Sequence, residues 1–250
     1  MSLKLITIDF WNTLFDSENG FARNQFRLNS LKSEIEALGY IITEKEFNPA
    51  IEASWGYFHN IWRNEHRTPS TASTVEFLFD YLKLPKHPEI IEKVAEAFGD
   101  CIIYHPPNLL TGAKEALEEL KENGYELGIV SDTGFSPGKT LRKVLYDAGI
   151  YNYFSEFSFS DETGYSKPSR ESFLAILNKY QIEPYASLHI GDIEETDIIG
   201  AKSLGMKAIK FIGDRTSNFV TKNNHSIADA ICQDWSEVVS TVNKLNSSII

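Results

Sequence analysis

The chain has 250 residues, enough for one large domain or for a domain with an insertion, and its formal net charge is −11 at pH 7. This negative balance argues against a broad surface for binding a nucleic-acid backbone. No apolar run approaches the roughly 20 residues that span a bilayer, and no secretory leader pattern is present, so we expect a cytoplasmic protein without a membrane partner. Cys101 and Cys232 lack metal-ligand spacing, which fits a reducing compartment.

Short apolar runs predict the strands of the fold. They cover about 4–9, 126–131, 155–160, 187–191 and 207–212, and a further run near 227–232 predicts an edge strand. Helical patterns separate the later runs, at 112–123, 138–148, 169–180 and 196–204. Strands that alternate with helices predict an α/β fold with a doubly wound, Rossmann-like parallel sheet.

One long stretch, from about 18 to 105, interrupts this alternation. It contains no convincing strand, its apolar residues recur at helical spacing, and glycine and proline residues divide it. We therefore predict four or so helices that form a helical domain at residues 17–106. This domain is inserted into an α/β core made of residues 1–16 and 107–250.

Polar side chains follow the first two predicted strands. Asp9 ends the first run, where an aspartate can act as a nucleophile or simply cap a turn. Ser131, Asp132 and Thr133 follow the second run, where hydroxyls and free backbone N–H groups can bind a phosphate oxyanion or form an ordinary turn. In a parallel sheet these strand ends converge on one crevice.

Charged side chains also lie near the ends of later strands. Lys167 precedes a helix and either neutralises charge in the crevice or is a solvated surface lysine. Asp192 ends the fourth main strand, and Asp197 follows five residues later. These carboxylates suit Mg²⁺, whereas a capping cluster at a helix N-terminus is the alternative.

The four elements, taken in order, resemble the motifs of the haloacid dehalogenase (HAD) superfamily, most specifically at Gly164-Tyr165-Ser166-Lys167-Pro168 and at Gly191-Asp192 with Asp197. The resemblance implies a HAD-like core with a mobile helical cap. It implies that Asp9 is the nucleophile and that Asp9, Asp192 and the backbone carbonyl of Trp11 hold Mg²⁺. Asp197 would belong to the metal site by steadying it and its waters. Ser131 and Lys167 would bind the phosphoryl group. The resemblance also makes Lys167 a catalytic residue.

Trp11 departs from this pattern. Phosphatases of the family have a second aspartate there, which serves as acid and base, and loss of such a group costs about 10²–10⁴-fold in rate. The dehalogenase branch has an aromatic residue there, works without metal and lacks the Gly-Asp pair, whereas Gly191-Asp192 is intact here. Without a cation, Asp9, Asp192 and Asp197 would repel one another.

These observations favour a Mg²⁺-dependent, phosphatase-like hydrolase that acts on a small organic phosphate through an aspartyl-phosphate. The alternatives are a metal-independent 2-haloacid dehalogenase and a catalytically weakened binding protein with the HAD fold. Asp132, His59 or His66 could supply the missing base. Arg63 could bind an anionic substrate if its helix end faces the crevice. The oligomeric state is not predicted.

Overall fold

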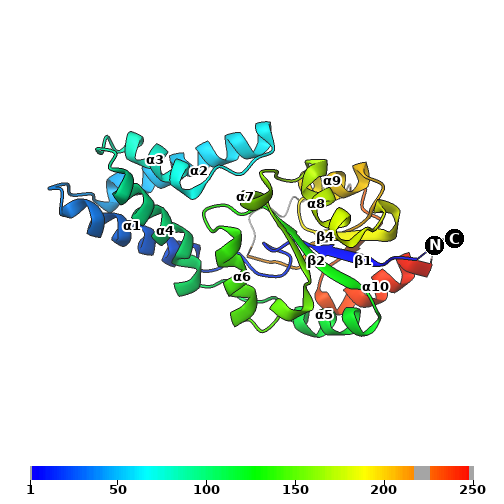
Figure 1. The fold of residues 1–250 in the computed structure, drawn as a ribbon. Helices are drawn as coiled ribbons and strands as arrows, with labels where there is room; N and C mark the ends of the chain where they lie inside the picture. The colour runs from blue at the N-terminus through cyan, green and yellow to red at the C-terminus, as the bar shows by residue number, and fades with distance from the viewer. Residues whose placement is uncertain (1, 217–225, 248–250) are drawn as a thin grey trace. The chain divides into compact units, whose positions relative to one another are not determined.

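A computed structural model describes residues 2–216 and 226–247 of the chain, which divide into two compact units (Figure 1). The α/β unit comprises 1–18, 107–132 and 145–250, and the helical unit comprises 19–106 and 133–144. The sequence did not predict that 133–144 groups with the inserted helices. A role of the helical unit as a cap stays a prediction.

The α/β unit contains a six-stranded parallel sheet with the strand order β3-β2-β1-β4-β5-β6. This confirms the predicted α/β, Rossmann-like fold class. The strands are β1 (Leu5–Ile8), β2 (Glu126–Ser131), β3 (Glu156–Phe159), β4 (Ser187–Gly191), β5 (Lys207–Phe211) and β6 (Ala230–Cys232). In this order the chain changes direction across the sheet between β1 and β4, the point at which such sheets bind their ligands.

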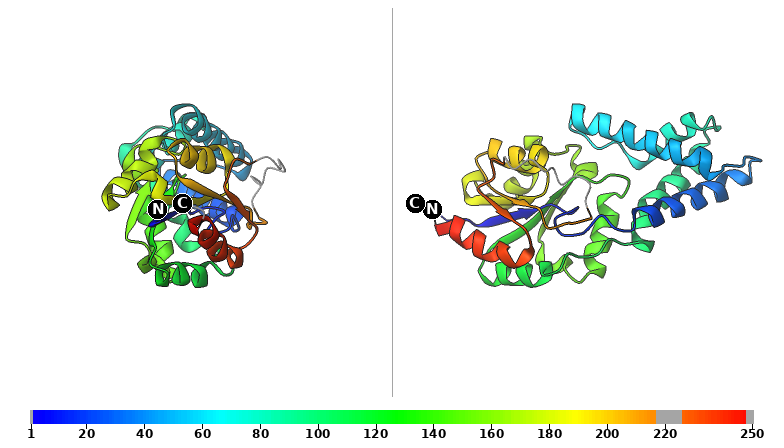
Figure 2. Two further views of the ribbon diagram at one scale, coloured as in Figure 1. Left: turned by 90° about the vertical axis from the view of Figure 1, so that its right-hand side faces the viewer. Right: turned by 180° about the vertical axis from the view of Figure 1, so that it is seen from behind.

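Helices cover both faces of the sheet. The helices in and next to this unit are α5 (Ala113–Glu122), α6 (Gly138–Asp147), α7 (Ser160–Thr163), α8 (Arg170–Tyr180), α9 (Ile199–Ser203) and α10 (Trp235–Ser247). α10 lies beside α5 on one face, and α8 lies beside α9 on the other (Figures 1 and 2). The predicted helix at 196–204 is different in form, because a π-helical turn at Glu194–Ile198 precedes α9.

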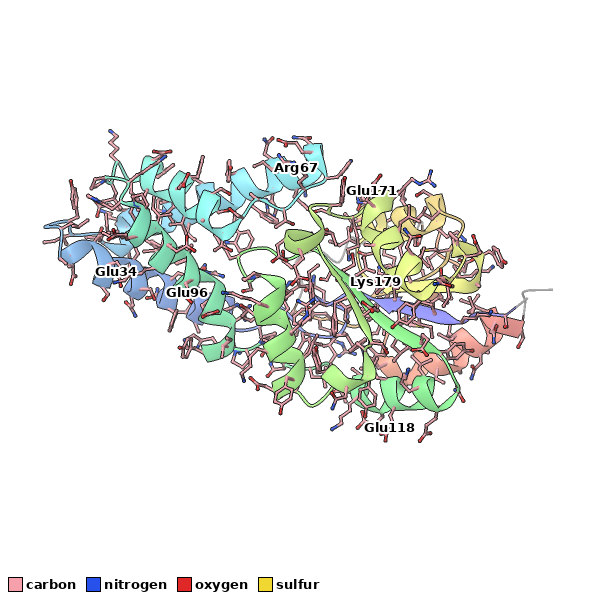
Figure 3. All side chains as sticks on the ribbon, viewed as in Figure 1. Glu34, Arg67, Glu96, Glu118, Glu171 and Lys179 are labelled. Carbon is pink, nitrogen blue, oxygen red and sulfur yellow. The ribbon has the colours of Figure 1, made fainter. Side chains whose placement is uncertain are left out.

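Exposed charges lie on the outer faces of these helices. Figure 3 shows Glu118 on α5 and Glu171 and Lys179 on α8, all three exposed. The inward side of α8 instead buries Phe173, Ile176 and Leu177 in the core. This split follows from the helical spacing of the apolar residues and explains how the sequence pattern predicted the helix.

The helical unit contains α1 (Gly20–Glu36), α2 (Glu44–Glu65), α3 (Thr71–Tyr81) and α4 (Pro88–Tyr104). A capping box joins Thr43 and Glu46 at the start of α2, and the Ser70 hydroxyl accepts a hydrogen bond from the Ser73 N–H at 3.1 Å at the start of α3. The helices enclose their own apolar core, which includes Phe47, Phe79 and Phe98. Within the described part of the chain, no helix has both the length and the hydropathy needed to cross a membrane.

Phe135 joins the segment 133–144 to this helical core. Its side chain is buried, and its ring centroid lies 4.5 Å from that of Trp55 and 5.9 Å from that of Phe98. The Arg27 guanidinium lies 4.7 Å from the same ring. Because these partners are distant in sequence, no local pattern at 133–144 indicates the association.

Candidate active site

Two adjacent strands deliver two carboxylates to one edge of the sheet. Asp9 follows β1 and Asp192 follows β4, and the Asp9 N–H donates to the Ile190 carbonyl at 2.9 Å. Asp9 is 5% exposed. The predicted convergence of these residues therefore follows from the pairing of β1 with β4 at the point where the strand order reverses.

The Lys167 ammonium lies between two carboxylates of this cluster. Its Nζ donates to Asp9 Oδ1 and to Asp197 Oδ1, both at 2.6 Å, and the side chain is 3% exposed. Burial opposes the charged form, but the two aspartates outweigh burial and raise the pKa of Lys167. Lys167 is thus a charged, fixed group of the site rather than a solvated surface lysine.

The carboxylates of Asp9 and Asp192 are destabilised in their ionised forms. Burial, with a smaller contribution from the charge of Asp197, raises the pKa of Asp9 to about 6 against the opposing charge of Lys167. Burial, together with Asp197 and Asp9, also raises the pKa of Asp192. Three carboxylates share one ammonium, so the cluster carries an excess of negative charge that a bound cation would relieve.

Asp197 uses both of its carboxylate oxygens within the protein. Oδ1 accepts from Lys167 and lies 2.9 Å from His189 Nε2. Oδ2 accepts from the Ile193 N–H at 3.0 Å and from the Thr196 hydroxyl at 3.1 Å. These four partners occupy the acceptor sites of a carboxylate, so Asp197 holds its neighbours in place, and its predicted role of steadying the metal site stays a prediction.

The remaining donors fit a hard cation. Asp9 and Asp192 supply carboxylate oxygens, and the excess negative charge around them favours Mg²⁺. Trp11 is half-buried in the tight turn after β1, where the Asn12 N–H donates to the Phe15 carbonyl at 2.7 Å. Across the described residues, no cluster of three histidine, cysteine or acidic side chains is arranged to hold a metal.

Asn12 is a site residue that sequence reasoning missed. Its backbone has a φ of 56°, a left-handed conformation that asparagine tolerates better than most residues. This turn brings the Asn12 side-chain amide to 3.1 Å from Asp192 Oδ2, to which it donates, and the Ser17 hydroxyl donates to Asn12 Oδ1. The signal in the sequence is an asparagine in the turn between Asp9 and Thr13.

Asp132 binds a backbone group near the site. Its Oδ1 accepts from the Lys167 N–H at 3.0 Å, so the loop after β2 holds the segment that carries Lys167. Ser131 is buried at the end of β2, beside this link. Asp132 therefore has a structural role in holding the segment that carries Lys167.

The other predicted residues belong to the helical unit. Thr133 is buried there, and Arg63 is exposed near the end of α2. His59 lies among the rings of Trp55 and Trp62, whereas His66 is exposed at the C-terminal cap of α2. A contact of any of these residues with the substrate stays a prediction.

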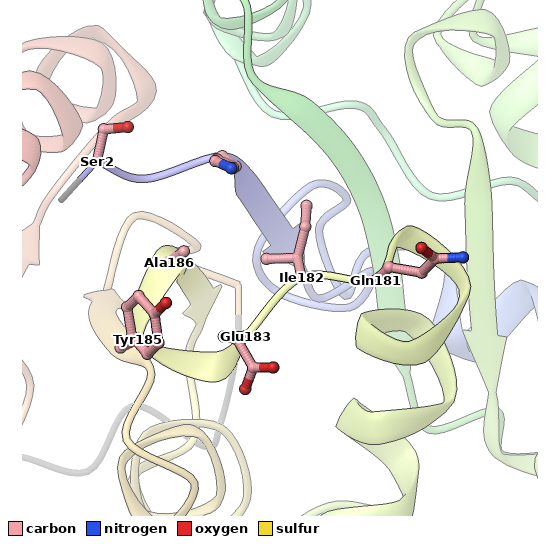
Figure 4. A pocket seen from close by; sticks show the side chains of 7 residues that line it. Ser2, Gln181, Ile182, Glu183, Tyr185 and Ala186 are labelled. Atoms are coloured by element: carbon pink, nitrogen blue, oxygen red, sulfur yellow. The ribbon is translucent and has the colours of Figure 1, made fainter.

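A pocket of about 300 Å³ lies at the opposite edge of the sheet (Figure 4). Its lining includes Lys4, just before β1, and Ala186, just before β4, with the exposed side chains of Glu183 and Tyr185. These residues lie at the amino ends of the strands, whereas Asp9 and Asp192 lie at the carboxyl ends. The pocket is therefore separate from the carboxylate cluster.

A family model of haloacid dehalogenase-like hydrolases matches residues 3–205, which include every element of this cluster. The chain belongs to the haloacid dehalogenase-like hydrolase family. Among its relatives, the glyceraldehyde 3-phosphate phosphatase of Pyrococcus abyssi is 31% identical over 141 residues, 54% of this chain and 56% of that protein. This HAD-family chain thus spans about half the length of the curated relatives that it matches.

Solved structures share the whole fold of this HAD-family chain. A 2-haloacid dehalogenase from Pseudomonas syringae has a TM-score of 0.69 at 19% identity, over 97% of this chain and 99% of that one. A Bacillus subtilis HAD hydrolase described as bound to magnesium has a TM-score of 0.65 at 19% identity, over 97% of this chain and 100% of that one. At such low sequence identity the structural likeness shows the fold. It does not distinguish a Mg²⁺-dependent hydrolase from a 2-haloacid dehalogenase.

Proposed function

We propose that this HAD-family hydrolase is a Mg²⁺-dependent phosphatase of a small organic phosphate, with Asp9 as nucleophile. The observation that carries the proposal is the contact of Asp9 with Lys167 beside Asp192 at the carboxyl edge of the sheet. A buried ammonium next to a buried carboxylate can bind a phosphoryl group and keep the nucleophile ionised. The phosphatase names of the similar proteins agree with this choice.

Different residues of the site carry out different parts of the proposed reaction. An Asp9 carboxylate oxygen attacks phosphorus, the bond from phosphorus to the ester oxygen breaks, and an aspartyl-phosphate forms on Asp9. The alcohol leaves with a proton taken from solvent. Lys167 and Ser131 bind the phosphoryl oxygens, and water then cleaves the aspartyl-phosphate to release inorganic phosphate. Asp9, Asp192 and the Trp11 carbonyl would hold Mg²⁺, which supplies positive charge against the carboxylates and the phosphoryl oxygens.

Asp197 acts on this site through Lys167. Burial raises the pKa of an aspartate, but here Lys167 and His189 outweigh burial and hold the pKa of Asp197 well below its usual range. Asp197 therefore stays ionised and anchors the lysine beside Asp9. In the proposed mechanism Asp197 is a positioning residue.

A panel of phosphate esters tests the proposal, with glyceraldehyde 3-phosphate included because a similar protein carries that name. Phosphate release is measured with MgCl₂ and with EDTA. We expect activity that requires Mg²⁺ and that Asp9→Asn lowers by at least about 10³-fold, because the nucleophile is lost. Asp80→Asn, an exposed aspartate of the helical unit paired with Lys86, is the matched control.

Halide release from 2-chloropropionate, measured on the same samples, tests the dehalogenase alternative. Trp11 is the residue that favours that alternative, whereas the charge excess around Asp192 favours the metal-dependent one. Metal-independent halide release that Asp9→Asn abolishes would replace the phosphatase proposal by a dehalogenase. Tight phosphate binding without turnover of any ester would favour a binding protein.

A further inference from the structure

Two buried polar side chains lie beneath the site, on neighbouring strands. Thr7 of β1 and His189 of β4 are register partners in the parallel ladder, and both side chains are fully buried. Thr7 Oγ1 lies 2.9 Å from His189 Nδ1, and the other ring nitrogen, Nε2, lies 2.9 Å from Asp197 Oδ1. A chain of contacts therefore runs from Thr7 through His189, Asp197 and Lys167 to Asp9.

The hydrogen-bond acceptors among these side chains determine which atoms donate. Asp197 can only accept at Oδ1, so His189 donates through Nε2–H. The ring of Phe173 meets the imidazole edge-on at 5.1 Å, and this buried setting lowers the pKa of His189 and favours a neutral ring with one N–H. Nδ1 then accepts, and the Thr7 hydroxyl is its donor. The other acceptor near that hydroxyl, the Leu188 carbonyl, is more distant at 3.4 Å.

Packing alone does not require this polar pair. Valine has nearly the shape of threonine, and two buried hydrogen-bonding groups replaced by apolar groups of the same shape can leave stability almost unchanged. The two hydrogen bonds of the imidazole do fix its orientation toward Asp197. His189 supplies one of the two donors to Asp197 Oδ1, and the other donor is the Lys167 ammonium.

We propose that His189, with its tautomer set by Thr7, is a positioning residue that orients Asp197 and thereby holds Lys167 beside Asp9. The effect of His189 on turnover rests on the proposed phosphatase function, whereas the hydrogen bonds of His189 do not depend on that function. Without the His189 donor, Asp197 Oδ1 keeps only one of its two partners, and the ammonium that it anchors shifts relative to Asp9 Oδ1.

Kinetics of matched variants test the effect on turnover. His189→Leu removes the donor, and we expect kcat to fall about 10–100-fold with KM changed less than about threefold, because Lys167 is misplaced in the reacting complex. His189→Gln carries an amide N–H of similar reach and is expected to restore most of kcat. Thr7→Val is expected to lower kcat, and Thr7→Ser to preserve it.

Ser158→Ala is the control for a merely structural loss. Ser158 is a buried strand residue whose hydroxyl donates to the Ser172 carbonyl at 2.6 Å, away from Asp197. The Ser158→Ala substitution should lower the Tm without lowering kcat. If His189→Leu does not fold, Thr7→Val, which is nearly isosteric, decides the question. Equal kcat in Thr7→Val and wild type, or in His189→Leu and His189→Gln, would overturn the proposal.

NMR of the ¹⁵N-labelled protein tests the geometry without any substrate. We expect the Nε2–H tautomer of His189 and a slowly exchanging Lys167 ammonium signal in the wild type, with that ammonium signal shifted or lost in His189→Leu. An Nδ1–H tautomer, or an unchanged Lys167 signal in His189→Leu, would contradict the positioning role. If the wild type hydrolyses no phosphate ester, the proposed function fails, and these spectra still decide the role of His189.

Discussion

Asp9 is a buried carboxylate that shares one ammonium with two other acids. Its pKa of about 6 lies above the ordinary value of 3.8 because burial disfavours the ionised form more than Lys167 favours it. A group whose folded-state pKa is raised contributes its stability below the unfolded pKa and loses it as pH rises through the folded pKa. Ionised Asp9 therefore destabilises the metal-free fold at neutral pH.

We predict that Asp9→Asn stabilises the metal-free protein at pH 7.5 by on the order of 1–3 kcal/mol, because the amide resembles the protonated acid. The gain should shrink as pH falls from about 6 toward 4, where wild-type Asp9 also becomes protonated. Urea unfolding in EDTA at several pH values measures it. A variant less stable than wild type at pH 7.5 would contradict the prediction.

Trp11 is the residue that limits turnover in the proposed mechanism. Its ring meets that of Phe10 edge-on at a centroid distance of 5.1 Å, and an indole cannot transfer protons to or from an ester oxygen. We predict that Trp11→Asp raises kcat for the best phosphate ester by about 10-fold or more, as a positioned acid and base is restored. Trp11→Asn should not raise kcat. Equal kcat values for the two variants would show that the base comes from another residue.

At the scale of elements, the π-helical turn after β4 presents Asp197 to the site. This turn comes so close to the strand end that a Cβ on Gly191 would lie 2.4 Å from Asp197 Cγ. Gly191 is needed because only glycine leaves room for that carboxylate. The sequence pattern predicted an ordinary helix here because periodicity does not distinguish a π-turn from an α-helical start.

We predict that Gly191→Ala displaces Asp197, lowers kcat at least about tenfold and destabilises the protein by about 1–3 kcal/mol. Steady-state kinetics and urea unfolding measure both effects. Gly56→Ala is the matched control, because a Cβ at Gly56 on α2 meets no atom within 4 Å. A Gly191→Ala enzyme with wild-type kcat would show that the Asp197 position is not needed.

At the scale of the whole molecule, each of the two units has its own buried apolar residues. Phe98 is buried in the core of the helical unit, and Ile176 is buried in that of the α/β unit. Each core is closed by residues distant in sequence, such as Phe135 for the helical unit. Two cores of this kind can open with different free energies.

We predict that Phe98→Ala, at a cost of about 3–5 kcal/mol, increases hydrogen exchange mainly in 19–106 and 133–144. Ile176→Ala, the matched change in the other core, should increase exchange mainly in the strands of the α/β unit. Hydrogen exchange followed by mass spectrometry of peptides distinguishes the two patterns. An equal increase across the chain in both variants would show a single cooperative unit.

The sequence by itself determined the main strands, the four inserted helices and the order of the motif residues, because hydrophobic periodicity is a local property. It also placed Asp9 and Asp192 at strand ends, and hence at one edge of a parallel sheet. It did not determine how the side chains use their hydrogen bonds, which depends on residues far apart in the chain.

Only the tertiary structure decided that Asp132 binds the Lys167 backbone, that four donors surround Asp197, and that Thr7 and His189 lie beneath the site. It also decided that 133–144 belongs to the helical unit. In each case the partners lie on different elements, and no repeat or spacing marks them. Burial makes such contacts obligatory, since an unpaired polar group in a core is costly, but only the assembled fold selects the partner.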